Sequence, residues 1–507
     1  MTDRPRGRAR QPHPAPAKRP HRQQPRNGKS GRQRPHARTV HDLDPRRAGY
    51  ETLRRIKPGD LLEPAVADSL RHLGYGPEHA HRVLPMLEDA TRFAMLFDHL
   101  ISHLSSRPPA ELDPDVRAAL HLFLSWYLLD DPRAAYAHGN AAVNMLSADH
   151  KGRGFVNALV RKLGEFVRVE QAATEDYREL AASGARPSLW ADRTRLGARR
   201  LLVSDRPIFP DPKQDLAAHL SIVGAMPRAL VDRLIAQHGP DAATQVAIAG
   251  IEKPATWIRP NPMIGSATEL AQEWTKRGIS AEMVPTPFDS IAIALTGKIG
   301  AMTDHPDWSR GGFYVQDYSA QLVAPALQAE HDETILDLCS APGGKAGHLA
   351  ELTRDRAKIL ACDLTEAKIE LIQQNIARMG YRSIATVQAD AAEVKFPEKF
   401  DRVLIDAPCS NSGVLARRVE ARHRISNESL RDLHTLQLRI LGNAGANLKP
   451  GGVILYSVCS VLMEEGPDVV HKFLRTRDDW EVEYENYLLP VPAWHDGGYV
   501  ARLRAPE

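Results

Sequence analysis

The feature that most constrains the fold of this 507-residue chain is a change of pattern after Glu333. From there onward, short apolar segments typical of strands alternate with amphipathic segments typical of helices. We expect strands over residues 334–338, 359–363, 385–390, 402–406 and 453–459. Such alternation is characteristic of a doubly wound, mostly parallel sheet, so the sequence predicts an α/β domain over residues 332–507.

Carboxylates end three of these predicted strands. Asp363, Asp390 and Asp406 close the second, third and fourth strands, and the carboxyl ends of parallel strands converge on one crevice where ligands bind. Asp363 is placed to accept hydrogen bonds from ribose hydroxyls. The first strand runs into a glycine loop that lets the backbone approach a ligand closely but is not the G-x-G-x-x-G of dinucleotide sites: Cys339, Ser340, Ala341, Pro342, Gly343, Gly344 and Lys345.

This crevice lacks a second phosphate-binding element. S-adenosylmethionine therefore fits it better than a dinucleotide does. Whether Asp390 would hold the adenine or the methionine end stays open.

The chain has four cysteines, and none stands in a C-x-x-C pair, so we expect neither a disulfide framework nor a metal site. Cys409 follows the fourth predicted strand and Cys459 ends the fifth, which should make both thiols face the crevice. A thiolate that adds to carbon 6 of cytosine turns carbon 5 into a centre able to attack a methyl sulfonium. Asp406 is placed to hydrogen-bond or protonate ring nitrogen 3 during that attack.

The N-terminal half predicts packed helices and then a mixed region. Residues 116–129 are apolar nearly all round, which indicates a buried helix, with Asp113 as its N-cap and Pro114 in its first turn. We expect an all-helical domain over residues 43–185 and a small α/β connector over 190–331, with helices within 229–238 and 270–277 and a strand over 291–295. Six apolar residues at alternating spacings of three and four should share one helical face: Leu87, Ala90, Ala94, Phe97, Ile101 and Leu104.

Residues 1–42 form a basic tail. Over its first forty residues, twelve Lys or Arg against the single acid Asp3 give a charge of +11 and leave −8 for the remainder of the chain. Rich in Pro, Gln and His and without aromatic residues, the tail is predicted to be disordered, either as a solvated extension or as an arm that neutralises nucleic-acid phosphates. The chain has no apolar stretch of membrane-spanning length and no secretory signal, so we expect a soluble, cytoplasmic protein.

Several motifs together carry a resemblance to a known family. The loop at 339–345, D-A-P-C-S at 406–410 and Y-S-V-C-S at 456–460 resemble the RNA 5-methylcytosine methyltransferases, and A-H-G-N-A-A-V-N at 137–144 with G-F-V-N-A-L-V-R at 154–161 resembles the end of a NusB-like domain, of a family that binds RNA. The combination is similar to the bacterial small-subunit ribosomal RNA (cytosine-5) methyltransferase B family, the RsmB/Sun type, over about residues 46–503.

The resemblance implies a Rossmann-like methyltransferase domain, S-adenosylmethionine as cofactor and RNA, most readily small-subunit ribosomal RNA, as partner, with neither membrane nor DNA. It makes Cys459 the nucleophile and gives Cys409 a part in product release. The cofactor contacts that it implies are the loop at 339–345, Asp363, Asp390 and Asp406.

Departures and alternatives remain. Val458 replaces the threonine that usually precedes the nucleophile, and the segment at 417–423, expected to meet RNA, lacks the usual proline and tryptophan. Transfer RNA or another RNA stays open as substrate. A catalytically inactive RNA-binding assembly protein is the alternative from another class, and the retained Cys409, Cys459 and Asp406 speak against it.

Overall fold

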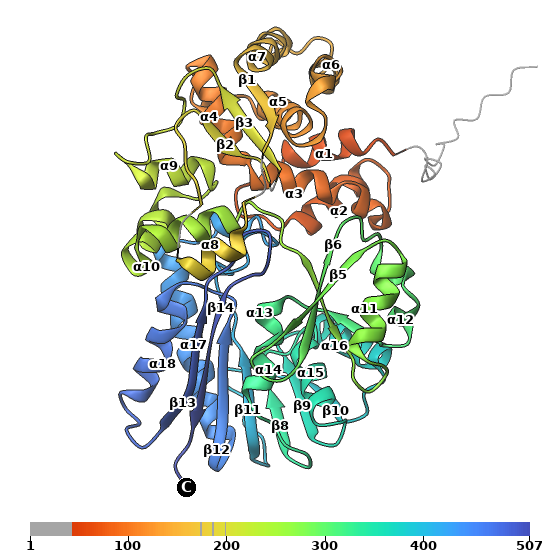
Figure 1. Ribbon diagram of the computed structural model, residues 1–507, viewed down its shortest axis with the longest axis vertical. Helices are drawn as coiled ribbons and strands as arrows, with labels where there is room; N and C mark the ends of the chain where they lie inside the picture. Colours follow the sequence, from red (N-terminus) through yellow and green to blue (C-terminus); the bar gives the residue numbers. More distant parts are fainter. Residues whose placement is uncertain (1–42, 173–174, 185–186, 198) are drawn as a thin grey trace, which may run out of the picture.

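The computed structural model describes residues 43–172, 175–184, 187–197 and 199–507, so the basic tail lies outside the described residues. Helices dominate the N-terminal part, two small sheets follow, and a large sheet with helices against it forms the C-terminal part (Figure 1). Among the described residues, no helix has the length and apolar content that crossing a membrane requires.

The N-terminal helices are short and close-packed. Their bounds are α1 (Pro45–Leu53), α2 (Leu62–His72), α3 (Leu84–Arg92), α4 (Ala94–Ser105), α5 (Pro114–Leu124), α6 (Ala135–Met145) and α7 (Arg153–Phe166). Asp113 caps α5 by accepting a hydrogen bond from the Asp115 backbone N–H, and Pro114 opens the helix, as the sequence predicts. The apolar face predicted from Leu87 to Leu104 is shared by α3 and α4, because the chain turns at Phe93 between them.

The all-helical prediction for residues 43–185 is wrong at its C-terminal end. After α7 the chain forms β1 (Val167–Gln171), which pairs antiparallel with β3 (Arg200–Ser204), and β3 pairs with β2 (Arg193–Arg195). Between β1 and β2, the described residues form one helix, α8 (Tyr177–Ser183). The β1 segment alternates valine with charged residues, which is a strand pattern that the helical prediction did not take into account.

The connector is mixed α/β, as predicted. It begins with α9 (Leu216–Val223) and α10 (Arg228–Ala249), which is kinked at Gly239. An antiparallel sheet of order β5-β6-β4-β7 follows. Its elements are β4 (Thr256–Pro260), α11 (Ala267–Lys276), β5 (Ser280–Pro285), β6 (Ile291–Thr296), α12 (Pro306–Ser309) and β7 (Phe313–Val315).

The C-terminal domain is built on a seven-stranded sheet of order β10-β9-β8-β11-β12-β14-β13. The first five strands in this order are parallel, which confirms the doubly wound prediction, whereas β14 and β13 add an antiparallel edge that the sequence reading missed. The strands are β8 (Thr334–Asp337), β9 (Lys358–Asp363), β10 (Ile384–Gln388), β11 (Phe400–Asp406), β12 (Leu448–Val458), β13 (Glu481–Leu488) and β14 (Gly498–Arg504).

Helices cover both faces of this sheet. Side chains of α14 (Val323–Ala326), α15 (Gly344–Leu352) and α16 (Glu366–Met379) pack against one face, and those of α17 (Asn427–Asn447) and α18 (Pro467–Leu474) against the other. Along β11, Leu404 packs on the face covered by α14, α15 and α16, whereas Val403 and Ile405 pack on the face covered by α17 and α18. This period of two explains why the central strands are apolar along their whole length.

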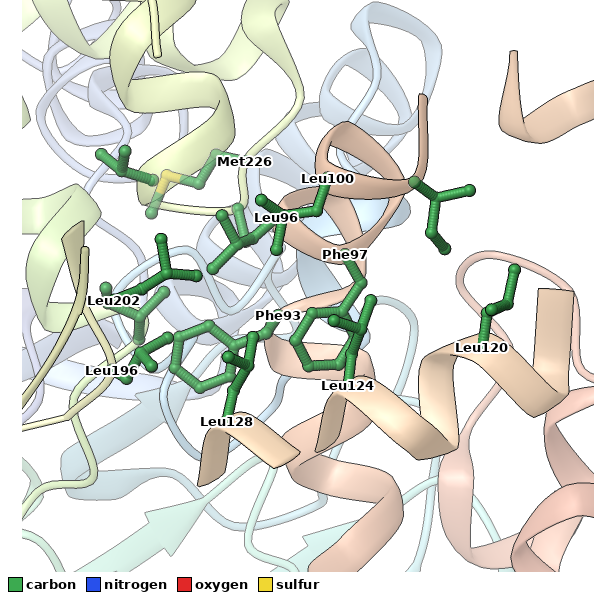
Figure 2. Close-up of a cluster of buried hydrophobic side chains, with 14 of the residues drawn as sticks. Phe93, Leu96, Phe97, Leu100, Leu120, Leu124, Leu128, Leu196, Leu202 and Met226 are labelled. Carbon is green, nitrogen blue, oxygen red and sulfur yellow. The ribbon is translucent and has the colours of Figure 1, made fainter. Parts of the chain in front are cut away.

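A single apolar core joins the N-terminal helices to the segments that follow them. Figure 2 shows Phe97 of α4, Leu124 of α5, Leu202 of β3 and Met226, before α10, in one buried cluster. The same cluster extends to Leu415, Ala421, Leu430, Val461 and Leu462 of the C-terminal domain. The helical and C-terminal parts are therefore packed on each other.

The segment at 417–423, expected to meet RNA, is largely a structural junction. Arg422 has no exposed surface, and its guanidinium donates to six backbone carbonyl oxygens, those of Val419, Arg92, Gly224, Ala225, Gly250 and Leu415. These carbonyls belong to the helical domain, the connector and the C-terminal domain. Arg417 pairs with Asp317 and Asp496 at 3.0 and 2.7 Å, which leaves Arg418 as an exposed arginine of the segment.

Candidate active site

The glycine loop lies between β8 and α15. Gly343 adopts a left-handed φ of 96°, and its N–H donates to the Ser340 carbonyl at 2.6 Å, so the chain turns sharply before α15 begins at Gly344. A Cβ at Gly344 would stand 2.9 Å from the Tyr314 ring, which explains the second glycine. The turn directs the start of α15 toward the carboxyl edge of the sheet.

Asp363 ends β9 and is tied to this loop. One carboxylate oxygen accepts the Ala341 N–H at 2.9 Å, and the other accepts from the Leu364 N–H and from Lys368, both at 2.8 Å. The side chain is almost fully buried. Asp390 differs: β10 ends two residues earlier, at Gln388, and Asp390 is exposed, where it accepts the Ala392 N–H at 2.8 Å.

Lys345 reaches from the loop to the end of β11. Its Nζ lies 2.5 Å from Asp406 Oδ2, while Asp406 Oδ1 accepts a hydrogen bond from the Ser457 hydroxyl at 3.1 Å. Burial lowers the pKa of Lys345, but the Asp406 carboxylate offsets this effect, so the pKa lies above its usual value. The predicted cofactor loop and the predicted catalytic acid are thus joined by an ion pair.

The two cysteines meet beside this pair. Cys409 Sγ lies 3.2 Å from Cys459 Sγ, and Cys459 Sγ lies 3.1 Å from Asn411 Oδ1. Both cysteines are half-buried. Cys459 also lines a cleft together with Lys345, Asp406 and other residues, among them some from the ends of β12 and β14. The structure therefore brings Cys409, Cys459, Asp406 and Lys345 together at one edge of the sheet.

The two thiols do not have the same surroundings. The hydrogen bond with Cys459, then burial, then the charges of Cys459 and Glu465 raise the pKa of Cys409 well above its usual value. Lys345, in contrast, lines the same cleft as Cys459. The Glu465 anion thus acts on Cys409, whereas a cation shares the cleft of Cys459.

Three residues of this site were not predicted from the sequence. Asp337 ends β8 with no exposed surface, and burial, together with the charges of Asp406 and Asp363, raises its pKa to about 7 against the opposing effects of Ser340 and Lys345. It carries the same signal as Asp363 and Asp406, an acid at a strand end. Asn411 and Glu465, which contact the cysteine segments, stand in loops where no local pattern marks them.

Asp113, Asp115 and His150 form the group among the described residues that could hold a cation. It lies at the start of α5, in the helical domain, and Asp115 is already paired with Arg54 at 2.8 Å. It takes no part in the cysteine site.

The C-terminal part of the chain matches a known protein family. Residues 324–494, which contain the glycine loop and both cysteines, match the model of the 16S rRNA methyltransferase RsmB/F family. Over these residues the chain is similar to the RsmB/F methyltransferases. The expected Rossmann-like methyltransferase domain is thereby confirmed, whereas the NusB-like character of the N-terminal helices stays a prediction.

Individual curated proteins are similar to this chain over longer stretches. The ribosomal RNA small subunit methyltransferase B of Klebsiella pneumoniae (strain 342) is 31% identical over 290 residues, 55% of this chain and 65% of the relative. Its Bacillus subtilis (strain 168) counterpart, a probable enzyme by name, is 32% identical over 54% of this chain and 60% of the relative, so the chain spans less than two thirds of either. The probable methyltransferase B of Synechocystis is 27% identical over 91% of this chain and 99% of the relative.

Solved structures share the fold. The crystal structure of PH0851 covers 91% of this chain and 99% of its own, with a TM-score of 0.66 at 22% identity. NSun6 from Pyrococcus horikoshii, solved with SFG, covers 56% of this chain at a TM-score of 0.51 and 19% identity. The match to PH0851 extends over the N-terminal helices, so the arrangement of the helical, connector and C-terminal parts also occurs in a solved structure.

Proposed function

We propose that this chain is an S-adenosylmethionine-dependent RNA cytosine-5 methyltransferase of the RsmB/F type that acts on small-subunit ribosomal RNA through a covalent cysteine adduct. The observation that carries the proposal is the 3.2 Å separation of Cys409 and Cys459 beside Asp406 and Lys345. Thiols on opposite sides of the sheet could not serve the same pyrimidine. The family match and the names of the relatives support methylation of ribosomal RNA.

The crevice suits the proposed cofactor by the chemistry of its donors. Burial and the charges of Asp337, Asp363 and Asp406 raise the pKa of the Cys339 thiol, so three carboxylates act on one point beside the glycine loop. Such a set favours a ligand with positive charge and hydroxyl groups. S-adenosylmethionine, which supplies an electrophilic methyl group, carries an ammonium, a sulfonium and a ribose. Asp363, Asp337 and the 339–345 loop would hold it, with Asp390 at the rim.

Attack on the base falls to Cys459. Its thiolate adds to carbon 6 of cytosine, while Lys345 compensates the negative charge that it brings into the crevice. The proton released by the Cys459 thiol passes through Asp406 to ring nitrogen 3, which neutralises the charge that develops on the ring. The Lys345–Asp406 ion pair fixes the position of that carboxylate. Carbon 5 is then nucleophilic and accepts the methyl group.

Departure of the product falls to Cys409. After methylation the carbon 5 proton must leave before the Cys459 thiolate is eliminated, and a second group next to the adduct can assist. Cys409 lies 3.2 Å from the attacking sulfur, and its raised pKa keeps it a thiol during attack. The roles in this proposal are therefore those that the resemblance implies.

Mapping 5-methylcytosine tests the proposal directly. Bisulfite sequencing of ribosomal and transfer RNA from cells with and without the protein should show one or more cytosines in small-subunit ribosomal RNA that lose methylation in its absence. Loss confined to transfer RNA would replace the substrate and keep the chemistry. Unchanged 5-methylcytosine in all RNA would remove the enzymatic proposal.

A further inference from the structure

Behind the two cysteines lies a buried carboxylate that the mechanism above does not use. Glu465 stands in the turn between β12 and α18 and has no exposed surface. Its Oε2 accepts hydrogen bonds from the Ser410 and Ser460 hydroxyls, both at 2.5 Å, and its Oε1 accepts the Ser410 N–H at 2.8 Å. Ser410 and Ser460 directly follow Cys409 and Cys459. One carboxylate thus joins the two segments that carry the reactive thiols.

The remaining contacts fix Glu465 itself. Gln437 of α17 donates to Glu465 Oε1 at 3.2 Å and to the Pro408 carbonyl at 2.9 Å, and the Tyr456 hydroxyl donates to the Glu465 carbonyl at 2.6 Å. The donors to the carboxylate are hydroxyls, an amide and a backbone N–H, and none of them is charged. Neutral donors in a buried site orient an anion but do not neutralise it, so its field reaches neighbouring groups.

That field acts on Cys409. The charge of Glu465 is one of the causes that raise the pKa of Cys409, after the hydrogen bond with Cys459 and burial. Lys345, the nearby cation, lines the same cleft as Cys459.

We propose that Glu465 is a positioning residue that holds the two cysteine segments together and, through its buried negative charge, restrains the reactivity of Cys409. Its catalytic meaning rests on the proposed function, because only an adduct mechanism needs two thiols with separate roles. The difference in thiol reactivity does not rest on it and can be measured without RNA or cofactor.

Two substitutions separate the hydrogen bonds of Glu465 from its negative charge. In Glu465→Gln the amide oxygen can accept from the Ser410 N–H and from Gln437, and the amide nitrogen can donate to the Ser410 and Ser460 hydroxyl oxygens. The hydrogen bonds between the two segments therefore survive without the charge. Glu465→Ala removes both. Glu51→Gln, at a buried glutamate of α1 in the helical domain, is the matched control for the loss of a buried carboxylate.

The measurement is the rate at which each cysteine of the full chain is alkylated by iodoacetamide, followed peptide by peptide by mass spectrometry between pH 6 and 9. In the unmodified chain we expect Cys459 to react faster than Cys409 at neutral pH, because the thiolate is the nucleophile. In Glu465→Gln the Cys409 rate at pH 7.5 should rise on the order of tenfold, because removal of the nearby anion increases the thiolate fraction. Glu51→Gln should leave the ratio of the two rates unchanged.

An unchanged ratio in Glu465→Gln would overturn the proposal and reduce Glu465 to a part of the packing, whatever happens to the melting temperature. Methyl transfer adds a second readout: kcat should fall while KM for RNA stays within about twofold, since Glu465 does not face the substrate. If the unmodified chain formed no 5-methylcytosine but Glu465→Gln still activated Cys409, the proposed function would fail and the thiol-state inference would stand.

Discussion

The cysteine crevice and the junction around Arg422 differ in the partners that their polar side chains have. At the junction, one guanidinium donates to six backbone carbonyls from three parts of the chain and has no surface left for a ligand. In the crevice, Cys409 and Cys459 stay half-buried and contact mainly each other and Asn411. Polar groups whose partners are all backbone hold the molecule together, whereas polar groups left with side-chain partners can exchange them for substrate.

The largest effect should come from the crevice. Cys459→Ala should lower methyl transfer by about 10⁴-fold or more, because nothing else can form the bond to carbon 6. Cys409→Ala should allow attack but trap the RNA on the protein. Methyl transfer assays and denaturing gels of the protein–RNA complex check both, with melting curves to show that each variant is folded.

Together, the two cysteine variants test which cysteine attacks and which assists release. A covalent complex in Cys459→Ala and none in Cys409→Ala would exchange the two roles. Full activity in both would place the chemistry elsewhere and remove the contrast with the junction.

The junction should show its effect in stability. Arg422→Leu would leave several buried carbonyls without a donor, and each such group costs about 1–3 kcal/mol, so we expect a loss of at least about 3 kcal/mol in the free energy of unfolding. Burial and the charge of Arg92 lower the pKa of Arg422 to about 9, so the side chain is still largely charged at neutral pH. Urea unfolding followed by circular dichroism measures the loss.

Arg418→Leu is the control for that experiment, because Arg418 is an exposed arginine of the same segment. It should change stability by less than about 0.5 kcal/mol. Equal effects of the two substitutions would mean that the carbonyls around Arg422 find water when the guanidinium is gone. The junction would then no longer differ from an ordinary surface.

The same contrast explains what the sequence could predict. Apolar strands that each end in an acid or a cysteine are local patterns, and parallel pairing alone brings their ends together, so Asp363, Asp406, Cys409 and Cys459 could be placed before the fold was known. The edge strands β13 and β14 lack such a pattern, because much of β13 is exposed and polar.

The partners of Arg422 could not be predicted for a related reason. Its segment was expected to meet RNA because of the resemblance, and the guanidinium donates to carbonyls as far away as residue 92. Backbone acceptors leave no trace in a sequence. Glu465 is hidden in the same way, because serine, glutamine and a backbone N–H are too common to mark a site. Sequence patterns reveal groups that lie at the ends of regular elements, and they miss groups whose role comes only from tertiary contacts.

Asp337 gives the smallest and most specific prediction, because it is a buried group of the crevice whose state depends on pH. With its pKa raised to about 7 by burial, it holds a proton between about pH 4 and 7 that the unfolded chain has already released. Its contribution to stability is therefore complete at low pH and is lost as the pH rises toward 7. Asp337→Asn removes this dependence, so its melting temperature relative to the unmodified chain should rise by a few degrees from pH 5 to pH 8. Differential scanning calorimetry at several pH values measures the two curves. Parallel curves would mean that Asp337 is ionised in the folded state throughout, compensated by Lys345, and that the crevice neutralises its polar groups as fully as the junction does.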